Sequence, residues 1–273
     1  MKPLRTIAVL PTLFTLANLV CGFFSIVVAA RVDAPHMAAM DPTVPDITNV
    51  MLSGWLIFLA MVFDALDGHV ARLSRTTSDF GGQLDSLCDV VTFGVAPGIL
   101  LVKMCPDFTY LHREAIWVIA AAYAASTALR LARFNVEHAE DSEHLTFSGL
   151  PSPAGAASIA SFAIMFYTLR QEDNPLVYAE QIDFVLQMVL PWFAIVVALL
   201  MVSRVPYPHV VNQIFRGHRS FGHIVRILFA LVAVAVIRGY SVPVICCAFV
   251  LGGPVRYVWE EFVLRREHKE PLF

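Results

Sequence analysis

Four aspartates lie within 26 residues, in or beside otherwise apolar stretches: Asp64, Asp67, Asp85 and Asp89. A charged side chain at membrane depth costs about 3 kcal/mol or more, so such residues are by default functional candidates. Carboxylates placed close together repel one another and must take up protons or share cations. Oxygen ligands suit hard cations, and no nearby set of His and Cys indicates zinc. We therefore expect two divalent cations, Mg²⁺ or Mn²⁺, arranged for displacement at a phosphoryl group.

The rest of the chain consists mainly of apolar segments of about 20 residues, each long enough for a transmembrane helix. The chain of 273 residues is 58% hydrophobic and 15% charged, with a mean hydropathy of +0.67. Soluble domains are about 25% charged, so we expect no soluble domain and no nucleic-acid partner. The composition predicts an all-α polytopic membrane protein, a single integral domain over residues 1–273. About eight transmembrane helices are expected, at 9–31, 50–71, 83–103, 115–135, 154–170, 184–204, 222–239 and 241–258.

The basic residues are unevenly distributed over the connections between these spans. With the N-terminus inside, 14 of the 19 Lys and Arg residues fall on the cytoplasmic side. The positive-inside rule then predicts cytoplasmic N- and C-termini in a multi-pass protein of the cytoplasmic (inner) membrane. The first apolar run is longer than a typical signal-peptide core, so we expect an uncleaved first helix. The five cysteines show no CxxC spacing and are expected to be packing residues.

This orientation places the aspartates around the cytoplasmic connection between the second and third spans. Asp64 and Asp67 are spaced i, i+3, and Asp85 and Asp89 are spaced i, i+4, so each pair shares one helix face. An antiparallel helical hairpin would bring the two faces together. We expect a pocket of four carboxylates just below the cytoplasmic headgroups.

Small and cationic residues beside the aspartates suit a nucleotide diphosphate. Gly68 and Gly81 lack side chains and would allow a nucleotide to approach the helices closely. Arg72 lies one turn beyond Gly68 and is suited to bind a diphosphate. Taken singly, the glycines could also be helix-packing residues, and Arg72 could be a positive-inside anchor.

Together these residues form one pattern at fixed spacing from Asp64 to Asp89, D-x2-D-G-x2-A-R-x8-G-x3-D-x3-D. The pattern resembles the signature of the CDP-alcohol phosphotransferase family at every fixed position. The resemblance implies that the four aspartates bind two divalent metals, and that Asp89 is also the base that deprotonates the acceptor hydroxyl. It further implies that Gly68, Arg72 and Ser78 contact the CDP moiety, and it suggests a homodimer.

The first apolar segment resembles the first helix of bacterial and archaeal phosphatidylserine synthases, a subfamily of this family. The shared pattern is Pro11-x3-Thr15-x2-Asn18 followed by Cys21-Gly22. The resemblance implies that Thr15 and Asn18 reach the nucleotide or its diphosphate. Without it, both side chains could equally satisfy the backbone of neighbouring helices.

Residues 84–89, 92–97, 130–135 and 147–153 resemble further signatures of the same subfamily. Arg130 and Arg133, spaced i, i+3 at the cytoplasmic end of the fourth span, could bind a serine carboxylate or a lipid phosphate. Alternatively, they are topological anchors.

The resemblance extends over about residues 5–165, so we expect a catalytic core at 1–165 and additional transmembrane helices at 166–273. It implies transfer of the phosphatidyl group from CDP-diacylglycerol to L-serine, giving phosphatidylserine and CMP. One alternative is the same chemistry with glycerol 3-phosphate or inositol phosphate as the acceptor. Another is a divalent-cation transporter, against which Gly68, Arg72 and the interfacial position of the aspartates argue.

Overall fold

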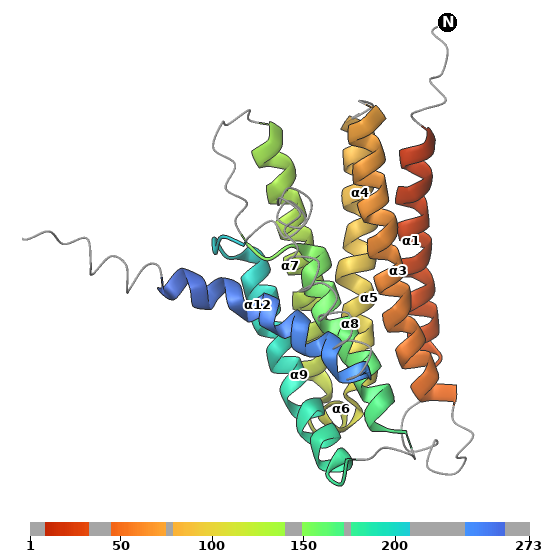
Figure 1. Ribbon diagram of the computed structural model, residues 1–273, viewed down its shortest axis with the longest axis vertical. Helices are drawn as coiled ribbons and strands as arrows, with labels where there is room; N and C mark the ends of the chain where they lie inside the picture. Colours follow the sequence, from red (N-terminus) through yellow and green to blue (C-terminus); the bar gives the residue numbers. More distant parts are fainter. Residues whose placement is uncertain are drawn as a thin grey trace, which may run out of the picture.

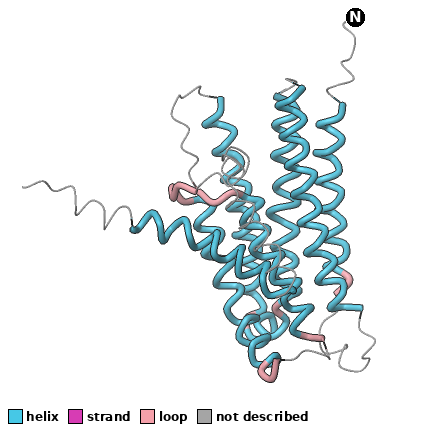
Figure 2. The backbone as a smooth tube through the Cα atoms, viewed as in Figure 1, coloured by secondary structure: helices cyan, strands magenta, loops and turns pink. Residues whose placement is uncertain are grey.

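The computed structural model describes residues 9–32, 45–74, 79–139, 149–171, 176–207 and 238–259. Within these ranges the chain consists of helices and short connections, without a β-strand element (Figure 2). Seven helical segments are long and apolar enough to cross a membrane. The expected class, an all-α polytopic membrane protein, is therefore confirmed. The span expected at 222–239 lies, except for its last two residues, outside the described part of the chain.

The elements follow one another in the order α1 (Val9–Ala30), α3 (Pro45–Ser74), α4 (Asp79–Asp89), η2 (Val90–Val95), α5 (Ala96–Met104), α6 (Pro106–Leu111), α7 (Arg113–Ala139), α8 (Ser152–Leu169), α9 (Ala179–Val202), η3 (Arg238–Tyr240) and α12 (Ser241–Trp259). The segment η2 is a π-helix, and α4, η2 and α5 together form the third span. Residue 165 lies within α8, and the expected division of the chain at this residue stays a prediction.

The third span lies at the centre of the helical bundle (Figure 1). In the most apolar 18-residue stretch of the third span, 67% of the residues are buried, as in α8, against 33% in that of α1. Helix α1 packs along α3, α3 packs against α8, α7 packs against α9, and α12 packs against α8. Apolar side chains from several helices fill the interior, among them Phe93, Leu100, Tyr123 and Ile159. This packing fixes the third span, which carries two of the four aspartates.

Small residues allow the helix backbones to approach closely, as is common where apolar helices meet in a membrane. A Cβ added to Gly54 would lie 2.9 Å from the carbonyl oxygen of Ala160, where α3 meets α8. One added to Gly98 would lie 3.1 Å from the carbonyl oxygen of Ala120, where α5 meets α7. A side chain at Gly54 would force the two helices apart, and one at Gly98 would be tighter than an ordinary contact.

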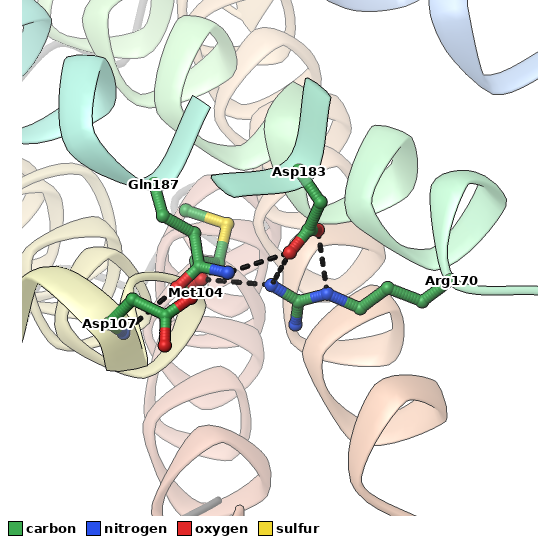
Figure 3. A network of polar contacts seen from close by, with 5 residues as sticks. All are labelled: Met104, Asp107, Arg170, Asp183 and Gln187. Carbon is green, nitrogen blue, oxygen red and sulfur yellow. Dashed lines mark hydrogen bonds and ion pairs between the residues drawn. The ribbon is translucent and has the colours of Figure 1, made fainter. Parts of the chain in front are cut away.

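A polar network joins the helices at the end of the bundle that lies away from the aspartates (Figure 3). Arg170 donates to both carboxylate oxygens of Asp183, at 2.7 and 3.1 Å. Gln187 donates to Asp183 at 2.6 Å and accepts from the backbone N–H of Asp107 at 2.9 Å. These bonds tie the end of α8 to α9 and α6, and they satisfy polar groups that are only partly accessible to water.

The turn before α8 depends on Gly149, which has a φ of 95°. This left-handed conformation is favourable for glycine and costly for other residues. The N–H of Gly149 donates to the carbonyl of Val205 at 2.9 Å, and the N–H of Leu150 donates to that of Leu200 at 3.0 Å. The start of α8 is thus held against the end of α9.

Candidate functional site

Three of the four aspartates meet at one point between α3 and α4. Asp64, Asp85 and Asp89 each offer one carboxylate oxygen, and these oxygens lie within 4.8 Å of one another. Oxygens on opposite sides of a Mg²⁺ ion are about 4.2 Å apart, since each Mg–O distance is about 2.1 Å. The cluster is therefore close to the size of one coordination shell. It joins the i, i+4 pair Asp85 and Asp89 to only one member of the i, i+3 pair, Asp64.

The aspartates are largely removed from solvent, which makes their mutual repulsion strong. Asp89 is 6% exposed and is repelled by Asp64 and Asp85. The Oδ1 atom of Asp85 is buried and has no hydrogen-bond partner among the described residues. A buried acceptor without a donor costs about 1–3 kcal/mol, and a cation would remove both this cost and the repulsion. The oxygen-only donor set fits a hard divalent cation.

Asp67 does not share this three-oxygen cluster, although it lies on the same helix one turn beyond Asp64. It is 7% exposed, and one of its carboxylate oxygens, Oδ2, accepts a hydrogen bond from the hydroxyl of Thr15. Thr15 belongs to α1, so a third helix takes part in the site. Helix α1 packs against α3, α4 and η2, whereas α3 and α4 have few close backbone contacts with each other. The two aspartate-bearing helices therefore approach one another chiefly through side chains, with α1 alongside both.

Asn18, one turn beyond Thr15 on α1, binds Asp89. Its Nδ2 atom donates to Oδ1 of Asp89 at 3.0 Å, and its backbone carbonyl accepts from the hydroxyl of Thr92 at 3.3 Å. The sequence predicted that Thr15 and Asn18 reach the nucleotide, and this contact stays a prediction. It did not predict that both residues bind the aspartates.

The helix changes its hydrogen-bonding pattern directly after Asp89. Residues Val90–Val95 form a π-helix, in which the N–H of Ala96 bonds to the carbonyl of Val91. Such π-helical turns inside α-helices occur frequently at functional sites. This one buries Thr92, whose hydroxyl reaches α1. Sequence periodicity predicted a regular span here, because the apolar pattern of 90–97 carries no signal for the change.

Helix α7 closes the other side of the cluster. Arg130 interacts favourably with the charges of Asp64 and Asp89, and its Nη1 atom donates to the hydroxyl of Ser152 at 2.7 Å. One and a half turns further along α7, Asn135 donates to the hydroxyl of Ser86 at 2.9 Å. Ser152 was missed by the sequence reasoning, although its position at the start of α8, behind Gly149, could have indicated it.

The remaining predicted residues lie around this cluster. Gly68 is exposed near the end of α3, and Gly81 lies in α4 and is half-buried. Arg133 is half-buried on α7, one turn beyond Arg130. Arg72 belongs to α3, but its side chain lies outside the described part, as does all of Ser78. The nucleotide contacts expected of these residues stay predictions.

Comparison with known proteins identifies the family. The sequence model for CDP-alcohol phosphatidyltransferases matches residues 8–200, more than half of the chain, and this stretch contains all four aspartates. The chain belongs to the CDP-alcohol phosphatidyltransferase family. The family resemblance drawn from the aspartate pattern is thus confirmed, and the aspartate cluster is a metal-binding candidate in keeping with a family that generally uses divalent metals.

Several relatives with names from this family are similar to this chain over about three quarters of its length. A CDP-diacylglycerol–serine O-phosphatidyltransferase of Methanocaldococcus jannaschii is 32% identical over 74% of this chain and 83% of its own. A protein of the same name from Helicobacter pylori is 30% identical over 76% of this chain and 75% of its own. An archaetidylserine synthase of Methanothermobacter thermautotrophicus is 31% identical over 77% of this chain and 73% of its own.

Proposed function

We propose that this chain transfers the phosphatidyl group of CDP-diacylglycerol to the hydroxyl of L-serine, giving phosphatidylserine and CMP. The observation that carries the proposal is the similarity, over three quarters of the chain, to relatives named for this reaction. The cluster of Asp64, Asp85 and Asp89 supports it, because a diphosphate needs cations to neutralise its charge.

The four aspartates together would hold two divalent cations, Mg²⁺ or Mn²⁺. The carboxylates of Asp64, Asp85 and Asp89 already converge. In Asp67, Thr15 binds only Oδ2, so the other oxygen, Oδ1, can face a cation. Bound there, the cations would neutralise the diphosphate and stabilise CMP as the leaving group.

Asp89 is the residue we assign as the base. It accepts the proton of the serine hydroxyl while the serine oxygen forms a bond to the lipid-proximal phosphorus and the bond from that phosphorus to the CMP oxygen breaks. The bond from Asn18 occupies Oδ1 of Asp89 and fixes the orientation of the carboxylate. A fixed position matters here because a carboxylate beside cations is a weak base, so that its contribution is mainly one of placement.

The substrates would occupy the two flanks of the aspartates. Gly68, Arg72, Ser78 and Gly81 would line the CDP side. On α7, Arg130 would bind the serine carboxylate, since its guanidinium is held beside Asp89 by Ser152. Arg133, one turn further along, would add a second positive charge.

We also propose that the site faces the cytoplasm across the inner membrane, with both termini on that side. The distribution of Lys and Arg supports this placement. A homodimer, suggested by the family resemblance, would be tested by light scattering of the purified protein in detergent.

The test is an acceptor comparison with purified protein in mixed micelles of CDP-diacylglycerol, with Mn²⁺ or Mg²⁺. We expect labelled L-serine to enter the lipid at a rate at least tenfold above that of glycerol 3-phosphate or inositol phosphate, with one CMP released per serine. A chelator should abolish transfer, and added cation should restore it. Preference for a phosphorylated alcohol would show that the acceptor is misassigned, and an absence of CDP-diacylglycerol turnover would refute the reaction.

A further inference from the structure

Helix α1 contributes two polar side chains that bind aspartates from two different helices. Thr15 donates to Oδ2 of Asp67 on α3, and Asn18 donates to Oδ1 of Asp89 on α4 at 3.0 Å. In each case one carboxylate oxygen is occupied and the other is left for another partner. The two donors lie three residues apart and face the same side of α1.

Both donors are buried and firmly placed. Thr15 is 3% exposed, and its single hydroxyl proton can also reach the carbonyl of Pro11 at 3.1 Å. Because an ionised carboxylate is a stronger acceptor than a carbonyl, the hydroxyl of Thr15 donates its hydrogen bond to Asp67. Asn18 is fully buried, and its backbone carbonyl is bound by Thr92 of η2. Donors held in this way orient carboxylates more strictly than solvent could.

The oxygen of the Asn18 carboxamide is the second polar atom of this side chain. This atom, Oδ1, is buried and has no hydrogen-bond partner among the described residues. The orientation of the carboxamide follows from chemistry, since only Nδ2 can donate to the carboxylate of Asp89. A buried acceptor of this kind needs a donor, because leaving it unpaired is costly. The donor is therefore expected to arrive with a ligand.

We propose that Thr15 and Asn18 are positioning residues: α1 presents Asp67 and Asp89 to the cations, and Oδ1 of Asn18 accepts a hydrogen bond from a donor brought by a ligand. This inference rests on the proposed function. The donor is either a water molecule on a bound cation or the hydroxyl or ammonium group of the acceptor. Outer residues that orient metal ligands typically contribute about 10- to 100-fold to metal affinity.

The experiment measures Mn²⁺ binding by electron paramagnetic resonance, on purified protein in detergent without CDP-diacylglycerol. Thr15→Val removes the hydroxyl at nearly constant shape, whereas Thr15→Ser keeps it. Asn18→Leu removes both polar arms of the carboxamide. Ser25→Ala is the matched control: Ser25 also joins α1 to α3, through Ser53 at 2.8 Å, but two turns away from Asn18 and without contact to an aspartate.

We expect Thr15→Val to weaken Mn²⁺ binding about tenfold and Asn18→Leu at least as much, with Thr15→Ser and Ser25→Ala within twofold of the unchanged protein. Thermal unfolding of all variants separates this effect from a general loss of stability. Mn²⁺ affinities in Thr15→Val and Asn18→Leu that match or exceed that of the unchanged protein would overturn the positioning role. If the unchanged protein itself binds no Mn²⁺, it is the proposed function that fails.

The source of the donor to Asn18 follows from kinetics at saturating Mn²⁺. If the acceptor brings the donor, Asn18→Leu should raise the KM for L-serine at least fivefold while Thr15→Val leaves it unchanged. If a cation-bound water brings it, the KM for serine stays constant and Asn18→Leu loses more Mn²⁺ affinity than Thr15→Val. Equal losses of Mn²⁺ affinity in the two variants, with a constant KM for serine, would mean that Oδ1 of Asn18 has no role in binding.

Discussion

Gly22→Ala tests whether the packing of α1 sets the geometry of the aspartates. A Cβ at Gly22 would lie 2.8 Å from both Cα and Cβ of Thr92 and still closer to its Oγ1, whereas ordinary contacts begin at 3.4 Å. Helix α1 would therefore have to move away from the backbone of η2 by at least about 0.6 Å, the difference between these two values. Asn18 lies one turn from Gly22 and would move with it. The distance from Asn18 Nδ2 to Asp89, now 3.0 Å, would reach about 3.6 Å, which is too long for a hydrogen bond.

Two costs follow from this shift. Overpacking a tight helix contact costs about 1–3 kcal/mol of stability. A lost hydrogen bond to a charged group is worth about 1.5–3 kcal/mol, and about 1.4 kcal/mol corresponds to a factor of ten in an equilibrium. We therefore expect Gly22→Ala to lower the unfolding temperature and to reduce both Mn²⁺ affinity and the rate of serine transfer about tenfold or more.

Two other glycines provide matched controls, measured in the same assays of Mn²⁺ binding, transfer and thermal unfolding. Gly54→Ala creates a comparable clash with Ala160 between α3 and α8, without disturbing the contact of α1 with η2. It should lower the unfolding temperature and leave Mn²⁺ affinity within twofold. Gly252→Ala places a methyl group in open space and should change neither quantity. The reasoning is refuted if Gly22→Ala binds Mn²⁺ normally, or if Gly54→Ala loses as much affinity as Gly22→Ala.

Three further predictions concern single residues. Asp89→Asn should abolish serine transfer and largely preserve binding of CDP-diacylglycerol, measured by equilibrium binding of the labelled lipid; equal loss of both would mean that Asp89 acts mainly as a metal ligand. Gly149→Ala forces an alanine into a φ of 95° and places its Cβ 2.6 Å from the carbonyl oxygen of Met201. It should lower the free energy of unfolding in SDS by about 3 kcal/mol, and unchanged stability would contradict the argument from φ. Arg170→Leu removes the cationic partner of Asp183 and leaves it only the bond from Gln187, so it should cost about 2 kcal/mol in the same assay while the KM for serine stays constant. A change in this KM would show that the network communicates with the site.

The helices and the aspartate pairs could be predicted from the sequence because both depend on local spacing. Apolar runs of about 20 residues predict transmembrane helices, and the i, i+4 spacing of Asp85 and Asp89 places both on one face of α4. A helical hairpin was expected to bring the two aspartate faces together. The carboxylate oxygens of Asp64, Asp85 and Asp89 do meet, whereas Asp67 is bound by Thr15 outside this cluster.

The partners of these residues could not be predicted, because they depend on how distant helices are placed against one another. Asn18 and Asp89 are separated by 71 residues, and no local pattern links them. Arg130 could be recognised as a cation near the site, but its bond to Ser152 requires the turn at Gly149 and the placement of α8 beside α7. The network of Arg170 and Asp183 carries no motif, and in the sequence its members are charges near helix ends.

Two of the residues that interact with an aspartate, Asn18 and Arg130, are themselves hydrogen-bonded to a further side chain. Asn18 binds Asp89 and is bound by Thr92, and Arg130 interacts with Asp89 and is bonded to Ser152. In a membrane interior, where water is scarce, unpaired polar groups are costly, so chains of bonded side chains are favoured. The chain of bonds from Thr92 through Asn18 to Asp89 transmits the packing of α1 to the carboxylates. Substitutions that move α1 by a fraction of an ångström should therefore alter cation binding without changing any residue that contacts the cation.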